Sequence, residues 1–371
     1  MTLLLLLLVA LLAFANGSND NGKGVATLVG FGVCRPRRAL IYATLATAIG
    51  GAASFWLAGG LLAGFSGGWL FAAGSTVDTH FYVAVLVGAC GWVLLASRTG
   101  MPVSTTHAII GALCGTGLVA FGGASVQWSA LGARFAIPLA LSPLLSLAIV
   151  YVLAFPILLI ARRWAGRCVC VVEQACAPSA TGCEGAAASI AVTSLPVVIT
   201  GSESACAQQS PAVQINVSSA ATTLHWLSAG LISFARGWND TPKIAALSLL
   251  ALAGAGQGMA IGFAIVTIGM AAGGLLAGRK VLETMAKKLT PLPLAESLTA
   301  SMVTATLVGM ASWSGLPVST THVATGSIIG AGLKHDPSGI HWGKVGEIAL
   351  SWLITLPAAA LIAAAAKFVM R

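Results

Sequence analysis

A six-residue sequence, Pro-Val-Ser-Thr-Thr-His, occurs at positions 102–107 and again at 317–322, 215 positions later. The identity extends upstream, because Ala-Ser-x-x-Gly precedes both copies, and a glycine-rich apolar run follows both. A match of this length in matching surroundings does not arise from composition alone. The chain therefore contains two copies of one structural unit, and any fold proposed for it must accommodate both.

Each copy of this hexapeptide has the residues of a helix start. Proline suits the first turn, where its missing N–H costs nothing, and serine and threonine hydroxyls cap free amides. The segments that follow, 108–119 and 323–333, are apolar and rich in glycine. A helix N-terminus lined with hydroxyls inside a membrane favours an anion site. The alternative is an ordinary capped helix, which the identical duplication makes the weaker interpretation.

The composition decides the class of protein. The chain has 371 residues and is 57% hydrophobic and 8% charged, whereas charged residues make up about 25% of a globular chain. This predicts an all-α polytopic membrane protein. The net charge is +9, and most of the Lys and Arg lie in loops, so they indicate the orientation of the chain in the membrane and no nucleic-acid partner. Residues 1–15 resemble a signal peptide but lack its basic region, and 224–235 occupy the same place in the second half, so we expect a first membrane helix there.

A second duplicated motif, Phe-Ala-x-Gly-x-Asn-Asp-x-x-Lys, occurs at 14–23 and 234–243, 220 positions apart. Glycine and Asn-Asp in an apolar run favour a break in the helix, which a membrane tolerates only where the backbone is buried in protein or lines a cavity. Asp20 and Lys23 are three residues apart and can neutralise each other there. A surface loop is the alternative, but residues 3–14 alone are too short to span a core of about 30 Å.

The remaining apolar segments divide evenly between the two halves. We expect a first membrane repeat at 1–161, a polar central segment at 162–223 and a second repeat at 224–371, with about 10–12 membrane segments in total. An odd number of spans per half predicts inverted-topology repeats built from broken helices and helical hairpins. The expected segments after the opening helix are 39–63, 81–97, 102–121, 135–161, 224–235 with 244–253, 261–277, 297–313, 317–333 and 345–366.

Basic residues predict the orientation. With both termini outside a cell (inner) membrane, thirteen loop Lys and Arg lie inside and three lie outside, as the positive-inside rule requires. The thirteen are Arg35, Arg37, Arg38, Arg98, Arg162, Arg163, Arg167, Arg279, Lys280, Lys287, Lys288, Lys334 and Lys344, and the three are Arg134, Lys367 and Arg371.

The central segment holds five of the eight cysteines, at 168, 170, 176, 183 and 206. Their spacing matches no zinc module, so no metal is assigned, and in a cytoplasmic linker they are expected to be reduced thiols. The strand-like run 190–200 leaves a small regulatory or metal-binding domain as the alternative. Cys34, Cys90 and Cys114 are interpreted as packing residues.

Together the two duplicated motifs resemble the inorganic phosphate transporter (PiT) family of phosphate and sulfate permeases. The resemblance covers both halves and implies a secondary transporter of phosphate, or of sulfate as in some relatives, that forms a homodimer and is not an enzyme. It implies two sets of site residues. The anion would be held by Ser104, Thr105, Thr106, Ser319, Thr320 and Thr321, and the coupling ion by Asn19, Asp20, Asn239 and Asp240.

The chain departs from the family at one position of each Asn-Asp motif. Sodium-coupled members have Asn-Asp-x-x-Asn, whereas the last residue here is Lys23 or Lys243. An ammonium group at that place would repel Na⁺ and occupy its volume. We therefore expect coupling to H⁺, with Na⁺ as the alternative, and no other cofactor.

Carboxylates bear on the choice of anion, because phosphate near neutral pH still carries a proton that Asp20 or Asp240 can accept, whereas sulfate carries none. If the neighbouring lysines neutralise these carboxylates, sulfate is the alternative substrate. Arg236 replaces Asn16 in the second motif and is either a two-point anion donor or a charge that reaches the membrane interface.

Three further residues are candidates. His107 and His322 end the hexapeptides and either relay protons or buttress their helices. Glu296 is either a coupling-site acid or an ordinary carboxylate at a helix start. Two other classes compete with a transporter: an anion channel, and an intramembrane hydrolase using Ser-His pairs, which the missing nucleophile elbow disfavours.

Overall fold

The computed structural model describes residues 1–57, 59–65, 69–72, 75, 77–175, 194–209, 213–249, 252 and 258–370. The chain forms two compact units. The first, here called the membrane unit, contains Met1–Phe155 and His225–Arg371, and the second, the central unit, contains Pro156–Leu224.

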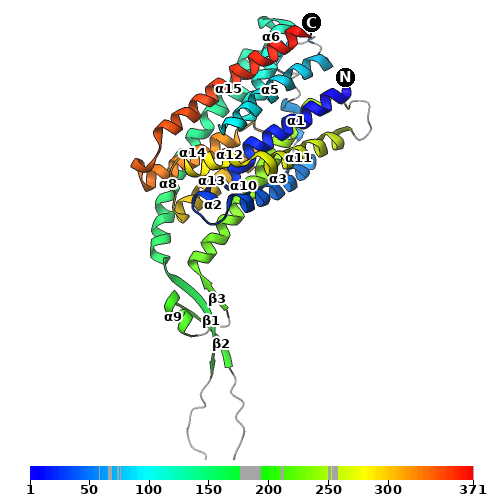
Figure 1. The fold of residues 1–371 in the computed structure, drawn as a ribbon. Coiled ribbons are helices and arrows are strands. Elements are labelled where there is room, and N and C mark those ends of the chain that lie inside the picture. The colour runs from blue at the N-terminus through cyan, green and yellow to red at the C-terminus, as the bar shows by residue number, and fades with distance from the viewer. Residues whose placement is uncertain are drawn as a thin grey trace, which may run out of the picture. The chain divides into compact units, whose positions relative to one another are not determined.

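Helices make up the membrane unit (Figure 1). Those of the first half are α1 (Thr2–Asp20), α2 (Ala26–Gly30), α3 (Pro36–Leu57), α4 (Gly59–Phe65), α5 (Thr79–Thr99), α6 (Thr105–Phe121), α7 (Trp128–Leu131) and α8 (Ile137–Trp164), which continues into the central unit. Those of the second half are α10 (Val217–Ala245), which begins in the central unit, α11 (Gly258–Ala277), α12 (Arg279–Lys287), α13 (Leu294–Trp313), α14 (Thr320–His335) and α15 (Trp342–Val369).

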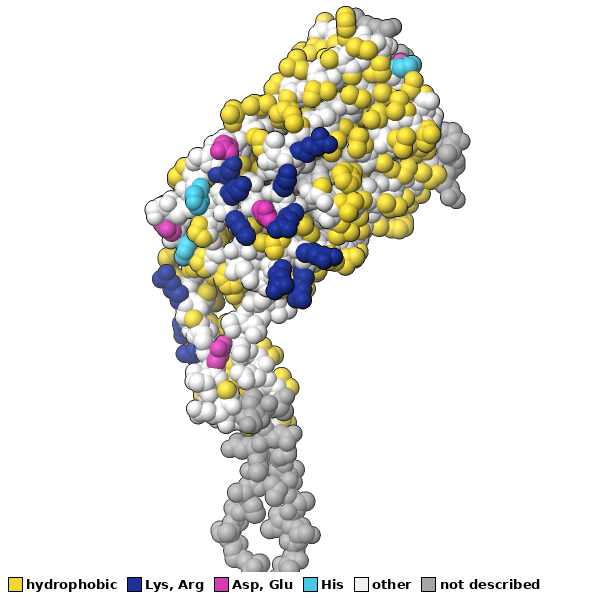
Figure 2. Space-filling view, in the orientation of Figure 1, with side chains coloured by type: hydrophobic (Ala, Val, Ile, Leu, Met, Phe, Trp, Pro, Cys, Tyr) yellow, Lys and Arg dark blue, Asp and Glu magenta, His cyan; other side chains and the backbone are white. Residues whose placement is uncertain are grey.

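These helices confirm a polytopic membrane protein. Within the described residues, seven helical stretches are long and apolar enough to cross a bilayer, and α6 is a shorter apolar helix. Each expected apolar segment contains a helix. Large apolar side chains such as Leu3, Trp56 and Leu353 point outward, where lipid would cover them. Figure 2 shows this apolar surface in yellow, with most of the visible Lys and Arg gathered to one side of it.

Glycines join the halves by letting helices of different repeats touch. A Cβ added at Gly17 of α1 would lie 2.0 Å from Met270 O of α11, and one at Gly273 of α11 would lie 1.9 Å from Phe14 O of α1. The equivalent pair in the other half is Gly237 of α10 and Gly50 of α3, each about as close to the facing backbone. Only small residues allow such contact. Helix α1 of the first repeat therefore packs against α11 of the second, and α10 of the second repeat packs against α3 of the first.

The hexapeptide helices obey the same rule. Gly111 and Gly115 of α6 face carbonyls of α15, and Gly326 and Gly330 of α14 face carbonyls of α8, with added Cβ atoms at 2.0 to 2.4 Å. The two glycine pairs are 215 positions apart, as the hexapeptides are. This reciprocal packing fits the expected repeats and brings the N-termini of α6 and α14 together.

Both hexapeptides start helices, as predicted, but with a different role for proline. Ser104 and Ser319 are the N-caps, because their hydroxyls accept hydrogen bonds from the amides of His107 and His322 at 3.3 Å. The prediction that proline occupies the first turn is wrong. Pro102 and Pro317 lie two residues before the cap, in extended chain that leads into the helix.

The Asn-Asp motifs differ from each other in backbone structure. In the first copy α1 ends at Asp20 and a 3₁₀ helix, Asn21–Val25, follows, so the predicted break is present as a change of helix type. In the second copy the prediction is wrong, because α10 runs through the motif to Ala245 and accommodates Pro242. The helical backbone already directs Asp240 and Lys243 toward their partners, so no unwinding is needed there.

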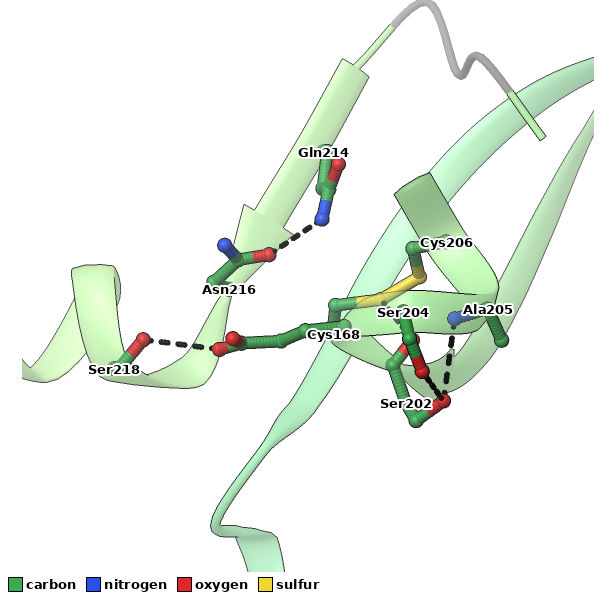
Figure 3. Close-up of a disulfide and its surroundings, with 9 residues drawn as sticks. Cys168, Ser202, Ser204, Ala205, Cys206, Gln214, Asn216 and Ser218 are labelled. Carbon is green, nitrogen blue, oxygen red and sulfur yellow. Dashed lines mark hydrogen bonds between the residues drawn. A yellow bond between two sulfur atoms is a disulfide. The ribbon is translucent and has the colours of Figure 1, made fainter. Parts of the chain in front are cut away.

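A three-stranded antiparallel sheet forms the central unit, an addition to the expected all-α fold. Its strands are β1 (Arg167–Ala175), β2 (Ser194–Ser202) and β3 (Val213–Asn216), in the order β2-β1-β3, and α9 (Glu203–Gln208) follows β2. The strand-like run around 190–200 falls partly in β2. Cys168 and Cys206 form a disulfide (Figure 3), whereas the sequence predicts reduced thiols. Cys176 and Cys183 lie outside the described residues.

Candidate functional site

The two Asn-Asp motifs and the two hexapeptides meet in the interior of the membrane unit. Their charged and amide side chains are all buried, with no more than 4% of any of them exposed. A charged group at such a position in a membrane protein is costly and marks a functional site by default. The buried set consists of Asn16, Asn19, Asp20, Asn21, Lys23, Arg236, Asn239, Asp240 and Lys243.

Oxygen atoms surround the ammonium group of Lys23. Its Nζ donates to Asn19 Oδ1 at 2.9 Å and to Val103 O at 2.7 Å. It also contacts Asp20 Oδ1 and Thr321 Oγ1. An amide, a carboxylate, a backbone carbonyl and a hydroxyl are the oxygen ligands that a hard cation takes from a protein. The ammonium group therefore lies among four oxygen atoms, here called the oxygen cage, and one of them comes from the opposite repeat.

The second copy builds a matching arrangement around Lys243. Its Nζ lies 3.0 Å from Thr106 Oγ1, 2.9 Å from Val318 O and 3.4 Å from Asp240 Oδ1. Thr106 belongs to the first hexapeptide, so each lysine contacts a threonine of the other repeat. The lysines thus tie the halves together across the centre of the molecule.

The two motif asparagines hold the extended chain before each hexapeptide helix. Asn19 Nδ2 donates to Met101 O at 2.9 Å and to Ser97 Oγ at 3.2 Å, and Asn19 Oδ1 accepts from Val103 N at 3.0 Å. In the second copy, Asn239 Nδ2 donates to Val318 O at 3.2 Å. These bonds position the hydroxyls of the helix starts.

Ser97 and Ser312 were not predicted as site residues, although the repeated Ala-Ser-x-x-Gly contains both. Ser312 Oγ donates to Asn239 Oδ1 at 3.3 Å, as the counterpart of the contact between Ser97 and Asn19. Asn21 and Thr47 were also missed. They bond each other at 3.1 Å and accept from Arg236. Asn21 lies within the first Asn-Asp motif, but Thr241 takes its place in the second copy, and Thr47 lies outside both motifs.

Asn16 links the two carboxylates. Its Nδ2 lies 2.9 Å from Asp20 Oδ2, 3.2 Å from Asp240 Oδ2 and 3.0 Å from Thr105 Oγ1. Its Oδ1 accepts from Arg236 Nη1 at 2.9 Å, and the same guanidinium atom is 3.9 Å from Asp240. Arg236 is 1% exposed, so the alternative that it reaches the membrane interface is wrong.

The predicted anion-binding hydroxyls lie around this cluster with different partners. Those of Ser104 and Ser319 accept from helix amides, and within the described part of the chain neither hydroxyl donates to another side chain. Thr105 Oγ1 lies 3.3 Å from Asp20 Oδ2, and Thr321 Oγ1 donates to Val103 O at 2.8 Å. Among the described residues, the hydroxyl of Thr320 has no hydrogen-bond partner.

His107 and His322 lie side by side, with ring centroids 4.7 Å apart. His322 Nδ1 lies 2.9 Å from Leu139 O of α8, and its ring is 4.0 Å from that of Trp352. A buttressing role fits these contacts. Both histidines border a cavity of about 510 Å³ whose other lining, including Leu356, is apolar.

Glu296 lies in the first turn of α13, away from the contacts just described, and is buried. Its Oε1 is 2.9 Å from His335 Nδ1 at the end of α14. The Glu296 carboxylate is therefore paired with a histidine, and among the described residues it makes no hydrogen bond to the central cluster.

The central cluster carries an excess of positive charge. Among its described side chains, three are cationic (Lys23, Arg236 and Lys243) and two are carboxylates (Asp20 and Asp240). The N-termini of α6 and α14 add the positive ends of two helix dipoles. Hydroxyls, helix amides and buried cations are the donors that a tetrahedral oxyanion needs.

Comparisons with known proteins agree with this chemistry. A model described as "Phosphate transporter family" matches residues 16–363. A protein of Rhizobium meliloti (strain 1021), named "probable low-affinity inorganic phosphate transporter", is 31% identical over 99% of this chain and 97% of its own length. A protein of the same name from Mycobacterium leprae (strain TN) is 26% identical over 99% of this chain and 78% of its own.

A solved structure titled "The sodium-dependent phosphate transporter" has the same fold, with a TM-score of 0.74 and 22% identity over 100% of this chain and 98% of that one. The resemblance found in the duplicated motifs is therefore confirmed by a match over nearly the whole sequence. The chain belongs to the phosphate transporter family.

Proposed function

We propose that this protein is a secondary active transporter of inorganic phosphate driven by protons, and that Lys23 and Lys243 replace its coupling cations. The family consists of transporters, so the intramembrane hydrolase is excluded. The observation that carries the proposal is the oxygen cage around Lys23 Nζ, in which a tethered ammonium group takes the place of a free ion.

Electrostatics supports independence from sodium. Two unit charges 4 Å apart repel each other by about 4 kcal/mol at an effective dielectric constant of 20. Since about 1.4 kcal/mol changes an equilibrium constant tenfold, a lysine in the cage would weaken Na⁺ binding by roughly a thousandfold. The ammonium group also fills the volume between the four oxygens, which adds a steric obstacle.

The anion is proposed to bind where the two hexapeptides meet. The free hydroxyl protons of Ser104 and Ser319 and the hydroxyl of Thr320 are available to donate, and the two helix dipoles favour negative charge. Thr106 contacts the ammonium group of Lys243, and Thr321 contacts that of Lys23. An anion bound to these two threonines would therefore also contact both ammonium groups. The lysines thus link anion binding to the opposite repeat.

Asp20 and Asp240 are proposed to carry the coupling proton and to select phosphate over sulfate. Both carboxylates approach the same amide nitrogen of Asn16, so they lie close to each other in a site closed to water. A carboxylate can accept the proton that hydrogen phosphate carries, and sulfate has no proton to offer.

Radiolabelled phosphate uptake into proteoliposomes tests this function. An inward proton gradient should drive accumulation above equilibrium, whereas an inward sodium gradient at fixed pH should not, and excess sulfate should not compete. Uptake that depends on sodium would disprove the tethered-cation proposal. Competition by sulfate would disprove the role given to the two carboxylates. Flux that neither saturates nor accumulates phosphate would indicate a channel instead.

A further inference from the structure

Three cysteines gather on one side of the sheet in the central unit. Cys168 and Cys170 are two residues apart on β1, and alternation along a strand places both side chains on the same face. Cys206 comes from α9, which follows β2 directly and contacts that face. Figure 3 shows Cys206 of α9 reaching the strand at Cys168. Two elements separated in sequence therefore bring their sulfur atoms together.

The cluster is closed to solvent. The three cysteines are no more than 2% exposed and pack with Val172 and Ile199. The β1 backbone is held from both sides, because Cys168 pairs with Gly201 of β2 and Asn216 of β3. The positions of two of the three sulfurs are thus fixed by the sheet.

The sulfur atoms of Cys168, Cys170 and Cys206 all lie within 4.8 Å of one another. Three sulfurs around one ion, with metal–sulfur bonds of about 2.3 Å, would lie about 4 Å apart in a trigonal arrangement. Cys170 lies within this range of both other sulfurs, and the Cys168 and Cys206 sulfurs, which are bonded to each other in the structure, would have to move apart to this distance. In the structure Cys168 and Cys206 are joined as a disulfide and Cys170 is free, so the pair must first be reduced.

Reduction is a balanced exchange with a dithiol. The dithiol gives two electrons and two protons to the Cys168–Cys206 bond, which becomes two thiols, and leaves as a cyclic disulfide. When a metal ion binds, each of the three thiols releases its proton and becomes a thiolate ligand.

We propose that the reduced cluster of Cys168, Cys170 and Cys206 is a binding site for Cu(I). Soft thiolates select Cu(I) and Zn²⁺ over hard cations. Zn²⁺ in a structural site takes four protein ligands, whereas the group formed by the described residues contains three sulfurs and no histidine or carboxylate. The three thiolates that the described part of the central unit brings together therefore favour Cu(I). This site is independent of the transport site in the membrane unit.

A competition titration tests the proposal on the full-length protein in detergent. The protein is reduced with a dithiol, freed of it under anaerobic conditions and titrated with Cu(I) in the presence of a chromogenic Cu(I) chelator. The titration uses a background in which Cys34, Cys176 and Cys183 are replaced by Ser. We expect one Cu(I) per chain, and a loss of affinity of more than about 100-fold in each single Ser variant of the three cysteines, since even outer-shell changes at metal sites cost 10–100-fold.

A second measurement needs no variant. The reduced wild-type chain is alkylated with and without Cu(I), and modified cysteines are located by peptide mass spectrometry. Cu(I) should protect Cys168, Cys170 and Cys206 together and leave Cys34 unchanged. Failure to compete with the chelator, or protection of other cysteines only, would overturn the site. Stoichiometric binding of Zn²⁺ in preference to Cu(I) would overturn the assignment of the ion.

Discussion

Arg236 Nη1 donates a hydrogen bond to Asn16 Oδ1 at 2.9 Å, and these two residues occupy the same position in the two copies of the Asn-Asp motif. The repeats therefore meet through equivalent residues, but the pair is unequal because one member is a cation and the other an amide. Asn16 Nδ2 in turn donates to the carboxylates of Asp20 and Asp240. The site is thus built from two similar halves with one added positive charge.

Arg236→Asn, which makes the two motifs alike, should abolish phosphate uptake and destabilise the protein. The change removes a buried cation from beside Asp240, and breaking a buried ion pair costs about 3–5 kcal/mol. Asn16, Asn21 and Thr47 would each lose a donor as well. Thermal unfolding in detergent measures the stability, and proteoliposome uptake measures the transport.

The matched control for this change is Arg134→Asn. Arg134 is exposed and lies over the ring of Trp69, so its loss should change stability by no more than about 0.5 kcal/mol. Normal uptake by Arg236→Asn would show that the added charge plays no part in anion binding.

Lys23→Asn should make transport respond to sodium. The substitution introduces the asparagine that the resemblance implies for sodium-coupled members, and it leaves Asn19 Oδ1, Asp20 Oδ1 and Val103 O without their ammonium partner. A free cation can then enter the cage with less repulsion. Phosphate uptake measured against Na⁺ concentration, with choline as replacement, should rise with Na⁺ in the variant and stay flat in the wild type.

Lys280→Asn provides the control, since Lys280 is an exposed lysine that donates to Arg98 O at 3.1 Å. It should leave the response to sodium unchanged. A folded Lys23→Asn protein that transports phosphate without any effect of Na⁺ would contradict the interpretation of the cage as a cation site.

Duplication explains why much of the site was predictable. Each motif occurs twice, so the sequence alone identified Asp20, Lys23 and their counterparts. The sequence around them is apolar, so their burial was also expected. Residues outside the duplicated motifs could not be identified in this way. Thr47 enters the site only because α3 packs closely against α10 at Gly50, a tertiary contact that local patterns do not encode.

The errors have physical causes as well. The break predicted in the second motif is absent because α10 continues through Pro242 to Ala245, with Lys243 reaching its partners from a helical backbone. The central disulfide depends on a sheet that brings Cys168 of β1 to Cys206 after β2, a separation of 38 residues that spacing rules could not resolve.

Gly17→Ala should destabilise the membrane unit. Its new Cβ would lie 2.0 Å from Met270 O, so α1 and α11 would have to separate, and overpacking of this kind costs about 1–3 kcal/mol. Gly309→Ala is the control, because no atom lies within 4 Å of its added Cβ and alanine is the better helix former by up to about 1 kcal/mol. The two variants should shift the thermal midpoint in opposite directions. Equal shifts would contradict the close packing of the repeats.

Thr321→Val should weaken phosphate binding while the fold persists. The substitution keeps the shape of the side chain but removes the hydroxyl that accepts from Lys23 and donates to Val103 O at 2.8 Å. A hydrogen bond to a charged group contributes about 1.5–3 kcal/mol, so the KM for phosphate should rise by roughly 10- to 100-fold if the threonine contacts the anion and holds the lysine. Uptake as a function of phosphate concentration gives this value.

The control and the rescue lie close by. Thr325 is one turn further along α14 and is buried, and among the described residues its hydroxyl has one partner, Met285 Sδ, at 3.8 Å. Thr325→Val should therefore leave KM unchanged, and Thr321→Ser, which keeps the hydroxyl, should restore most of the affinity. An equal rise in KM for Thr321→Val and Thr325→Val would mean that general packing of α14 is responsible. A rise confined to Thr321→Val would assign the effect to the hydroxyl that lies between the two repeats.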